Sequence, residues 1–506
     1  MRSTVQSPIE TGQHGLMVDI ECSLSNGLPG IIIVGFANKA VDEAKERIRS
    51  AFTGSKIDLP RKRITINLAP ADVPKDSSGF DLAIAASILQ ASHQSRRDLT
   101  GFAIMGELGL DGTVRPIRGI IGKLLVSKNR GIKSFIIPSS NLSQALLVPN
   151  IDIVTVTSLH DLYGFLNDAD KVPQSTGDGQ APSSATATTE VQLQDIIGQE
   201  SGKRAIEICA AGGHNLLLGG PPGTGKTMLA KTLPGLLPPL SREEMLEITH
   251  LHSLANSNFD EIITTRPFRS PHHSASNVAI IGGGNNLRPG EMSLSHRGIL
   301  LFDELPEFNR TTIEALRQPL EDRTITIARA KDTAQYPAHF IFVATANPCP
   351  CGHYGTSKTC RCLPHQIIRY RRKLSGPILD RIDLYVDVHE IDNSRLLMES
   401  KNTSTATNSI KSRISHSRQI QSDRFGSSQK LNADMTNKDV KTYAKLEPAA
   451  KSILDEAANR FGLSARSYMR TVKVSRTIAD LDGSLPITSS HIAEALQYRP
   501  QHYHDE

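Results

Sequence analysis

The sequence predicts an α/β protein with three structured regions: a mixed α/β region, a parallel-sheet region and an all-helical region. Strand-like and helix-like runs alternate before residue 168. The middle region begins with a strand, a glycine-rich turn and a helix. Helix-period patterns follow residue 437. The 506 residues, 38% of them apolar, are enough for a separate core in each region. This length, with only six cysteines, excludes a small disulfide-stapled scaffold.

Residues 1–167 are expected to form the first domain. The β-rich runs GIIIVGF, RITINLAP and FIIP alternate there with the helical patterns AVDEAKERIRSAF and FDLAIAASILQAS. The first residues, MRSTVQSPIETGQHG, lack the apolar core of a signal peptide, and no apolar run approaches the length of a membrane span. We therefore expect a cytoplasmic protein with no membrane partner. Residues 168–190 are predicted to be a flexible linker, because residues 173–190 contain no large aliphatic or aromatic side chain.

A glycine-rich loop opens the second domain, residues 191–395. It reads Gly220-Pro221-Pro222-Gly223-Thr224-Gly225-Lys226-Thr227, matches G-x-x-x-x-G-K-[ST], and lies between an apolar strand and a helix as that motif requires. The glycines let backbone N–H groups turn toward phosphates, Lys226 would reach the β- and γ-phosphates, and Thr227 would bind Mg²⁺. The loop predicts ATP and Mg²⁺ as ligands.

Two further strands end in polar side chains suited to the same site. The apolar run GILLF is followed by Asp303 and Glu304, of which Asp303 would hold the ion and Glu304 would polarise the attacking water. The next apolar run, HFIFVATA, ends in Asn347, which would sit beside the γ-phosphate. The alternatives are a solvated pair of acids and an asparagine that only turns the chain.

The remainder of the chain is predicted to be helical. Residues 396–437 form a polar connector that holds one amphipathic helix, IKSRISHSRQI. Residues 438–506 carry helix-period patterns, the last of which has Thr488 or Ser489 as its N-cap. We expect a small all-helical domain there.

The order of these motifs resembles an AAA+ ATPase of the magnesium-chelatase type, and nearly the whole chain resembles the ComM/YifB family. The segments that carry the resemblance are NGLPGIIIVGFA, PKDSSGFDLAIA, RPFRSPHHSAS, LLFDELPEF, NPCPCG and KLSGPILDRID. The resemblance implies a ring ATPase, usually hexameric, that acts as a DNA branch-migration helicase during natural transformation. It also implies that the C-terminal helices form the lid of the AAA+ domain.

The same resemblance assigns roles to two arginines. Arg381 would be the finger that completes the neighbouring subunit's site, and Arg466 would be the nucleotide sensor of the lid. Arg381 lies between Asp380 and Asp383 in sequence, so a plain surface ion pair is the alternative. Arg470, one turn after Arg466, competes for the sensor role.

Two basic segments are candidate DNA contacts. In the loop-rich segment 266–297, Arg266, Arg269 and Arg288 would meet phosphates, and the run from Gly282 to Asn286 suits a mobile loop that faces a pore. The alternative is an ordinary solvated loop.

The second segment is a predicted hairpin, in which the strand TITIA is followed by a turn with Arg329 and Lys331 at its tip. Related ring helicases place such a hairpin in the central channel, where Arg329 and Lys331 would grip DNA. A hairpin tip that is basic only for solubility is the alternative.

Four clustered cysteines suggest a structural metal site within the insertion 349–362. Cys349, Cys351, Cys360 and Cys362 form two C-x-C pairs, and four thiolates suit tetrahedral Zn²⁺. His353 and His365 are alternative ligands. C-x-C is tighter than the usual spacing, so thiols without a metal are the competing interpretation.

The first domain also resembles the proteolytic domain of Lon, over residues 106–138, but it lacks the Ser–Lys dyad of that family. Matching PIRGIIGKLL to the Lon pattern places Ile121 at the lysine position, and matching KDSSG places Gly79 at the serine position. Ser78 and Lys123 lie only one and two residues away. A serine without its base is a poor nucleophile, so we expect a Lon-like fold that serves assembly or partner contact.

The charge of the chain is unevenly distributed. The formal net charge is +5, and the segment 361–381 alone carries a net charge of +5. This concentration makes DNA a plausible partner despite the small total. Two alternative functions remain at this stage: a magnesium-chelatase motor that inserts metal into a porphyrin, and an ATP-regulated assembly factor without helicase activity.

Overall fold

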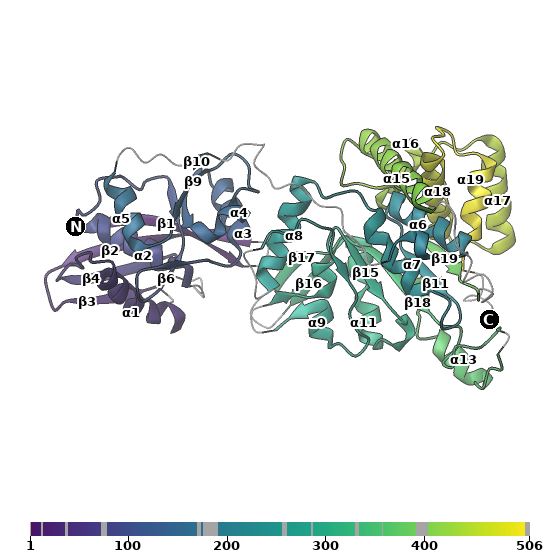
Figure 1. The fold of residues 1–506 in the computed structure, drawn as a ribbon, viewed down its shortest axis with the longest axis horizontal. Coiled ribbons are helices and arrows are strands. Elements are labelled where there is room, and N and C mark those ends of the chain that lie inside the picture. Colours follow the sequence, from purple (N-terminus) through teal and green to yellow (C-terminus); the bar gives the residue numbers. More distant parts are fainter. Residues whose placement is uncertain are drawn as a thin grey trace. The chain divides into compact units, whose positions relative to one another are not determined.

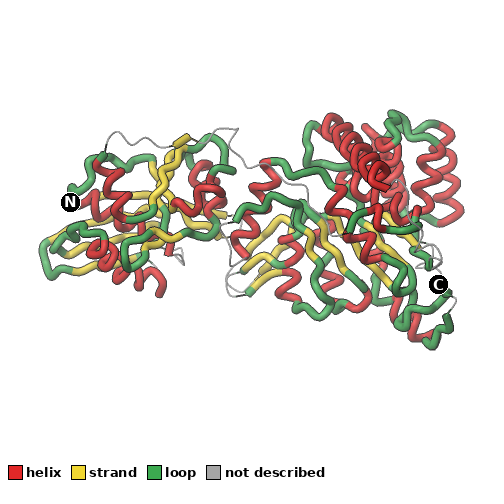
Figure 2. Tube along the Cα trace, viewed as in Figure 1, coloured by secondary structure: helices red, strands yellow, loops and turns green. Residues whose placement is uncertain are grey.

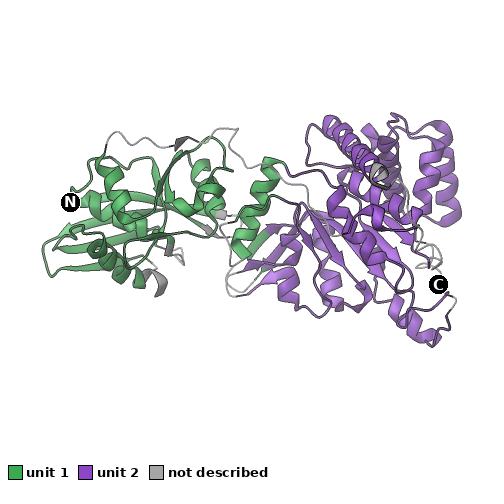
Figure 3. Ribbon diagram, viewed as in Figure 1, with its two compact units in different colours: residues 1–184, 241–264, 328–335 green, residues 185–240, 265–327, 336–506 purple. Residues whose placement is uncertain are grey.

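The computed structural model describes residues 2–11, 14–35, 39–71, 78–168, 174–175, 191–255, 261–284, 287–328, 333–356, 358–390 and 403–500. Two compact units make up the chain (Figure 3): unit 1 comprises residues 1–184, 241–264 and 328–335, and unit 2 comprises residues 185–240, 265–327 and 336–506. Their first boundary falls within the predicted linker, most of which lies outside the described residues. No described helix combines the length and apolarity needed to cross a membrane.

Unit 1 is built on an eight-stranded mixed sheet with the order β10-β9-β8-β5-β1-β2-β4-β3. The strands are β1 (Arg2–Thr11), β2 (His14–Ser25), β3 (Gly30–Val34), β4 (Arg63–Ala69), β5 (Phe102–Ile104), β8 (Ser134–Pro138), β9 (Asp152–Val156) and β10 (Gln174–Ser175). A separate two-stranded ladder joins β6 (Glu107–Leu108) to β7 (Val114–Arg115). Strands β3 and β4 therefore fall within the runs GIIIVGF and RITINLAP, and β8 contains the run FIIP, as predicted.

The helices of unit 1 are α1 (Lys39–Gly54), α2 (Asp81–Ala91), α3 (Ile120–Asn129), α4 (Leu142–Ala145), α5 (Leu159–Asn167) and α8 (Arg242–Ala255). All residues of α2 except Gln90 are buried, so this helix is the centre of the core. Asp81 is fully buried at its start and accepts hydrogen bonds of 2.7 and 3.0 Å from the Arg47 guanidinium. Helix α8 lies in the predicted second domain by sequence, yet it belongs to unit 1 because Arg242 donates to the carbonyls of Leu146 and Leu147.

Unit 2 contains a five-stranded parallel sheet with the order β12-β15-β18-β11-β19 (Figure 1). The strands are β11 (Leu216–Gly219), β12 (Phe268–Arg269), β15 (Ile299–Phe302), β18 (Ile341–Ala346) and β19 (Leu384–Asp387). Every residue of β15 and β18 is buried, which is typical of central parallel strands covered on both faces. Figure 2 shows helices on both sides of these strands.

The helices around this sheet are α6 (Glu200–Gly212), α7 (Lys226–Thr232), α9 (Asn277–Ile281), α10 (Glu291–Leu294), α11 (Arg310–Ala315), α12 (Arg317–Asp322), α13 (Pro364–Arg371) and α14 (Gly376–Leu379). The predicted hairpin is present as β16 (Thr324–Ala328) and β17 (Thr333–Pro337), of which residues 328–335 are counted in unit 1, and its tip lies outside the described residues. The glycine run is not simply a loop, because β13 (Gly282–Gly283) pairs with β14 (Arg288–Pro289).

The C-terminal helices are α15 (Thr403–Phe425), α16 (Asn437–Tyr443), α17 (Pro448–Phe461), α18 (Ala465–Leu481) and α19 (Ser489–Gln497), the last with Thr488 as its N-cap. Helix α15 has 23 residues and is much longer than the predicted amphipathic piece. Its length follows from packing on α6: Arg418 donates to the Ala210 carbonyl, and the buried Gln421 donates to the Ala211 carbonyl. These bonds satisfy carbonyls at the end of α6 that have no partner within that helix.

Candidate functional site

The glycine-rich loop connects β11 to α7 and requires glycine at its first position. Gly220 has φ +144°, and a Cβ atom on it would lie 2.2 Å from the Val388 carbonyl oxygen. Gly225 caps α7 in the left-handed region with φ +88°. The loop thus places its backbone and the start of α7 at the carboxyl edge of the sheet, where parallel α/β folds bind ligands.

Lys226 turns its ammonium back into the loop. The Nζ atom donates to the carbonyls of Gly220 and Pro221, each at 2.7 Å, and to Asn347 Oδ1 at 3.2 Å. Burial lowers the pKa of Lys226, although the nearby carboxylates of Asp303 and Glu304 oppose this shift. A buried ammonium surrounded by oxygen atoms can exchange these acceptors for phosphate oxygens.

The strand order brings the three predicted motifs together. Strand β18 lies between β11 and β15, so the residues that follow all three strands share one edge of the sheet. Thr227 Oγ1 donates to the two oxygens of Asp303 at 3.0 and 3.2 Å. Thr345, fully buried on β18, donates to Asp303 Oδ1 at 2.7 Å. Hydroxyl groups on two different elements, α7 and β18, thereby orient the Asp303 carboxylate.

Glu304 and Asn347 complete this edge. Glu304 has a left-handed backbone (φ +55°), which its N–H donation to Thr345 Oγ1 at 2.8 Å supports. Its side chain is exposed, and Asn347 Nδ2 donates to its Oε1 at 3.5 Å. Asn347 therefore contacts both Lys226 and Glu304.

The donor set fits a magnesium–nucleotide complex. A hydroxyl and a carboxylate, on Thr227 and Asp303, already lie within hydrogen-bond distance of each other, and oxygen ligands are those that Mg²⁺ prefers. The loop supplies backbone N–H groups and the Lys226 ammonium for phosphate oxygens. Glu304 is accessible to a water molecule beside them.

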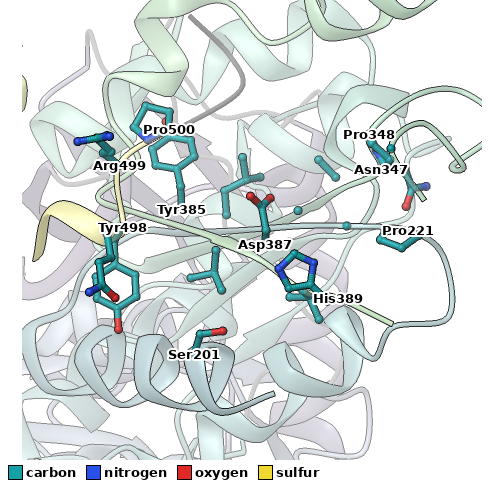
Figure 4. Close-up of a pocket in the computed structure, with 18 of the residues that line it drawn as sticks. Ser201, Pro221, Asn347, Pro348, Tyr385, Asp387, His389, Tyr498, Arg499 and Pro500 are labelled. Atoms are coloured by element: carbon teal, nitrogen blue, oxygen red, sulfur yellow. The ribbon is translucent and has the colours of Figure 1, made fainter. Parts of the chain in front are cut away.

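A pocket of about 710 Å³ borders the loop (Figure 4). Gly220, Pro221 and Asn347 line it together with Asp387 and His389 at the end of β19. Its volume lies within the range of small-molecule sites in proteins, roughly 300–1,000 Å³. This edge of the sheet is therefore open to a cavity of ligand size.

Arg381 and Arg466 meet at one acidic residue, Glu321 of α12. Glu321 forms an ion pair with Arg381, and its Oε2 atom lies 3.9 Å from Arg466 Nη2. Arg381 also donates to the Pro377 carbonyl at 2.6 Å. The two arginines, predicted separately, thus belong to a single cluster that we call the arginine pair.

Asp383 and Arg470, the residues named in the competing interpretations, both have other partners in the structure. Asp383 accepts from the Asn215 N–H at 3.0 Å and pairs with His214 Nδ1 at 3.3 Å, not with Arg381. Burial raises the pKa of Asp383, but His214, Arg470 and the Asn215 N–H together outweigh that effect and lower the pKa. Arg470 donates to the carbonyls of Ile382 and Leu379, at 2.6 and 3.4 Å, which leaves Arg466 as the exposed arginine of the two.

The arginines proposed for DNA contact divide into two groups. Arg266 donates to the carbonyls of Pro238 and Arg297, each at 2.8 Å, and Arg269 makes bonds of 2.5 and 2.6 Å to Glu291. Both side chains therefore have partners within unit 2, and their contact with DNA stays a prediction. Arg288 is exposed on β14. Arg329 and Lys331 lie outside the described residues.

The four cysteines converge as a metal-binding cluster. The Sγ atoms of Cys349, Cys351, Cys360 and Cys362 all lie within 4.8 Å of one another, and those of the first three are separated by 3.4, 3.6 and 3.8 Å. Tetrahedral zinc with Zn–S bonds of about 2.3 Å requires sulfur separations of about 3.8 Å, so the geometry fits. Within the described chain this donor cluster consists of cysteines, without His353 or His365.

The surroundings of the cluster also suit a metal. Backbone N–H groups of His353 and Arg361 lower the pKa of Cys351 to about 6, which favours its thiolate, whereas burial and the neighbouring thiols raise the pKa of Cys362 to about 12. Gly352 packs against the phosphate loop, since a Cβ on it would lie 2.6 Å from Pro222 Cδ. We call residues 349–374 the cysteine module. Tyr354 and Arg371 of this module line the pocket beside the loop.

In unit 1, the residues at the Lon positions do not form a dyad in the described structure. Ile121 is fully buried, and Lys123 donates to the Arg118 carbonyl at 2.6 Å. Gly79 accepts a backbone bond from Gly106. Loss of protease chemistry remains a prediction, because the side chain of Ser78 lies outside the described part of the structure.

Three residues of the site were not identified from the sequence. Thr345 was hidden within the apolar strand pattern, although its position two residues before Asn347 was a usable signal. Glu321 contacts Arg381 across 60 residues of chain, and no local motif marks it. Gln199 donates to the carbonyls of Thr224, at 3.3 Å, and His389, at 2.7 Å, and so ties the loop to the end of β19.

Family models for magnesium chelatase match most of the chain. The model described as magnesium chelatase, subunit ChlI, matches residues 192–396. The model described as subunit ChlI of Mg-chelatase matches residues 20–141, and the model of the ChlI C-terminal region matches residues 404–499.

Individual relatives resemble the chain over its full length. It is 43% identical over 499 residues to the competence protein ComM of Haemophilus influenzae, which covers 98% of this chain and 97% of that protein. It is 42% identical over 494 residues to the protein YifB of Salmonella typhimurium, covering 96% and 95%. A stretch of 95 residues is 37% identical to Lon protease 2 of Bacillus subtilis, covering 18% of this chain and 17% of the protease.

Proposed function

Because the chain belongs to the ComM/YifB family of magnesium-chelatase-like AAA+ ATPases, we propose that it is an ATP-driven DNA translocase that promotes branch migration. The relative from Haemophilus influenzae is named a competence protein, which supports a role in the integration of transforming DNA. The proposal includes a cytoplasmic location, where such DNA is processed.

ATP hydrolysis would use the residues at the shared edge of β11, β15 and β18. Bound MgATP supplies the phosphoanhydride bond and the ion that neutralises its charge. Lys226 would hold phosphate oxygens, while Thr227 and Asp303 would hold the ion. Glu304 would orient and deprotonate the attacking water, and Asn347, which contacts Lys226 and Glu304, would align both.

The position of the arginine pair supports the proposal that the subunits assemble into a ring. Arg381 and Arg466 share Glu321 and lie in one cluster, so a neighbouring subunit's nucleotide could meet both guanidinium groups at once. Head-to-tail contacts of this kind close into rings. We propose a homo-hexamer in which the pair completes the adjacent subunit's site and neutralises charge on the γ-phosphoryl group.

The cysteine cluster is proposed to hold one structural Zn²⁺. Four thiolate donors at near-tetrahedral spacing leave no open position for a substrate, which is typical of structural sites. The ion would fix the cysteine module beside the phosphate loop.

The hairpin is the observation that carries the DNA part of the proposal. Strands β16 and β17 lie in the chain between the carboxylate strand β15 and the sensor strand β18, so the hairpin is tied to both sides of the ATP site. By sequence its tip carries Arg329 and Lys331, which would grip the DNA backbone in the channel.

A branched-DNA assay tests the proposal directly. A fluorescently labelled four-way junction, incubated with protein, Mg²⁺ and ATP, should be resolved by the wild type and not by Lys226→Ala. Glu304→Gln should bind ATP and assemble but show neither turnover nor junction resolution, because the water lacks its base. Failure of the wild type to resolve three- or four-way junctions at any protein concentration would contradict the proposal of a translocase.

The same purified protein can be tested for the two alternative functions. The names of the matching family models favour testing metal insertion into a porphyrin, which absorbance spectroscopy detects. ATP turnover with neither metal insertion nor junction resolution would instead indicate an ATP-regulated assembly factor.

A further inference from the structure

We infer that the cysteine module is a binding surface for single-stranded DNA, separate from the residues at the hairpin tip. The inference rests on the proposed translocase function and adds a second contact for the same nucleic acid. It is carried by the charge, the exposed side chains and the fixed position of residues 349–374.

The module lies in a stretch of sequence without a single acidic residue. Residues 333–379 contain no Asp or Glu, while the module itself carries six cations: Lys358, Arg361, Arg369, Arg371, Arg372 and Lys373. All of these except Arg371 are exposed. The acidic neighbour Glu307 lies 3.7 Å from Lys373, and both side chains of this pair are well exposed, so it neutralises little of the surface.

Apolar and aromatic side chains are exposed among these cations. Tyr354 is 46% exposed, Leu363 is 56% exposed and Ile368 is 37% exposed. The Arg371 guanidinium lies 5.2 Å from the centre of the Tyr354 ring. Cations interleaved with exposed aromatic and aliphatic groups suit a strand that offers both phosphates and unstacked bases. A duplex hides its bases, and the carboxylate side chains of an acidic peptide have no ring to stack on Tyr354.

The surface is held in place rather than presented on a loose loop. The four cysteines cluster its first part, residues 349–362, and Ile367 and Tyr370 anchor α13 by their buried side chains. Figure 1 shows α13 at the margin of unit 2, beyond the strands of the sheet. A preformed surface loses less entropy on binding than a mobile one.

Its place in unit 2 connects it with the ATP site. Pro348 alone separates Asn347 from Cys349, and Gly352 packs on Pro222 of the phosphate loop. A strand bound to the module would therefore be held by a segment that contacts the nucleotide-binding residues.

The test compares two triple variants of the full chain by fluorescence anisotropy with labelled oligo(dT) and with a duplex of the same length. The module variant is Lys358→Ala/Arg361→Ala/Arg369→Ala. The control variant, Lys438→Ala/Lys441→Ala/Lys445→Ala, removes three exposed lysines from another part of unit 2. At physiological salt the module variant should bind oligo(dT) about tenfold more weakly, and the slope of log K against log salt should fall by about 2, since each phosphate contact on a single strand contributes about 0.7.

A second pair of variants separates stacking from charge. Tyr354→Ala should weaken oligo(dT) binding by about fivefold or more and leave duplex binding unchanged, whereas Tyr354→Phe should bind as the wild type does. Thermal melting of each variant establishes that it is folded.

Each outcome bears on a different statement. Equal losses in the module and control variants, or an unchanged salt slope, overturn the inference and leave the translocase proposal intact. A loss confined to the duplex overturns the choice of single strands. A wild type that binds neither DNA overturns both the inference and the proposed function.

Discussion

At the scale of single residues, Thr345 links the two carboxylates of the site. Its hydroxyl donates to Asp303 Oδ1 and accepts from the Glu304 N–H, so one side chain positions both the proposed magnesium ligand and the backbone of the proposed catalytic base. The left-handed conformation of Glu304 costs free energy in a non-glycine residue, and this hydrogen bond offsets part of the cost.

Thr345→Val should therefore impair use of magnesium more than binding of the phosphates. The Mg²⁺ concentration for half-maximal ATPase activity should rise by about tenfold or more, because an outer-shell partner of the metal ligand is lost. ATPase titrations with Mg²⁺ at saturating ATP measure this shift. Thr345→Ser keeps the hydroxyl and should behave as the wild type; an unchanged Mg²⁺ requirement in Thr345→Val would show that Asp303 needs no such support.

The phosphate-loop residues, Asp303, Glu304 and Asn347 were predictable because each follows an apolar strand with a recognisable end. Their contacts follow from strand order alone, since adjacent parallel strands end at one edge. Glu321 was not predictable, because its contacts join segments far apart in sequence. The same holds for Arg266 and Arg269, whose partners are carbonyls and a carboxylate that only the fold brings near.

At the scale of elements, composition predicted the sheet better than the polar helices. The strands of unit 2 are continuous apolar runs and could be identified directly. Helix α15 reads as a connector because it is rich in Ser, Thr and Asn, yet Ser417 and Gln421 are fully buried against α6. Polar side chains that satisfy another helix's carbonyls stabilise such a helix without an apolar pattern.

The cysteine module is the element for which we propose a structural metal. Purified protein should contain about one zinc per chain, and Cys360→Ser should lose most of it because three thiolates bind less tightly than four. Cys22→Ser, which alters a buried cysteine of unit 1, is the matched control and should retain the metal. Elemental analysis with a parallel thiol titration decides the matter. Metal-free protein from a chelator-free preparation, with six titratable thiols after unfolding, would show that the cysteines are structural thiols only.

At the scale of the whole molecule, segments of the two units alternate along the chain. Segments 241–264 and 328–335 of the ATPase sequence belong to unit 1, so the two units are linked by several chain crossings and not by the linker alone. Sequence patterns place domain boundaries at polar stretches and cannot reveal an exchange of this kind, because helix α8 carries an ordinary helical pattern.

A mixing experiment tests the proposed assembly. Lys226→Ala and Arg381→Ala should each be inactive alone, since one lacks the phosphate ligand and the other lacks the arginine for its neighbour. A 1:1 mixture should recover up to about a quarter of wild-type ATPase activity, because random placement in a head-to-tail ring pairs an intact loop with an intact arginine at that frequency. Steady-state ATPase assays after subunit exchange measure the recovery. A mixture as inactive as its components would mean that Arg381 acts within its own subunit.

Only Pro348 separates Asn347, which follows β18, from Cys349 of the cysteine cluster. Pro348 has a fixed φ and no freedom to absorb a displacement by rotation about that bond. We therefore expect a shift of Asn347 toward or away from Lys226 to displace Cys349 as well, because only this one restricted residue lies between them. Conversely, a displacement of the cysteine cluster would alter the contacts of Asn347 with Lys226 and Glu304.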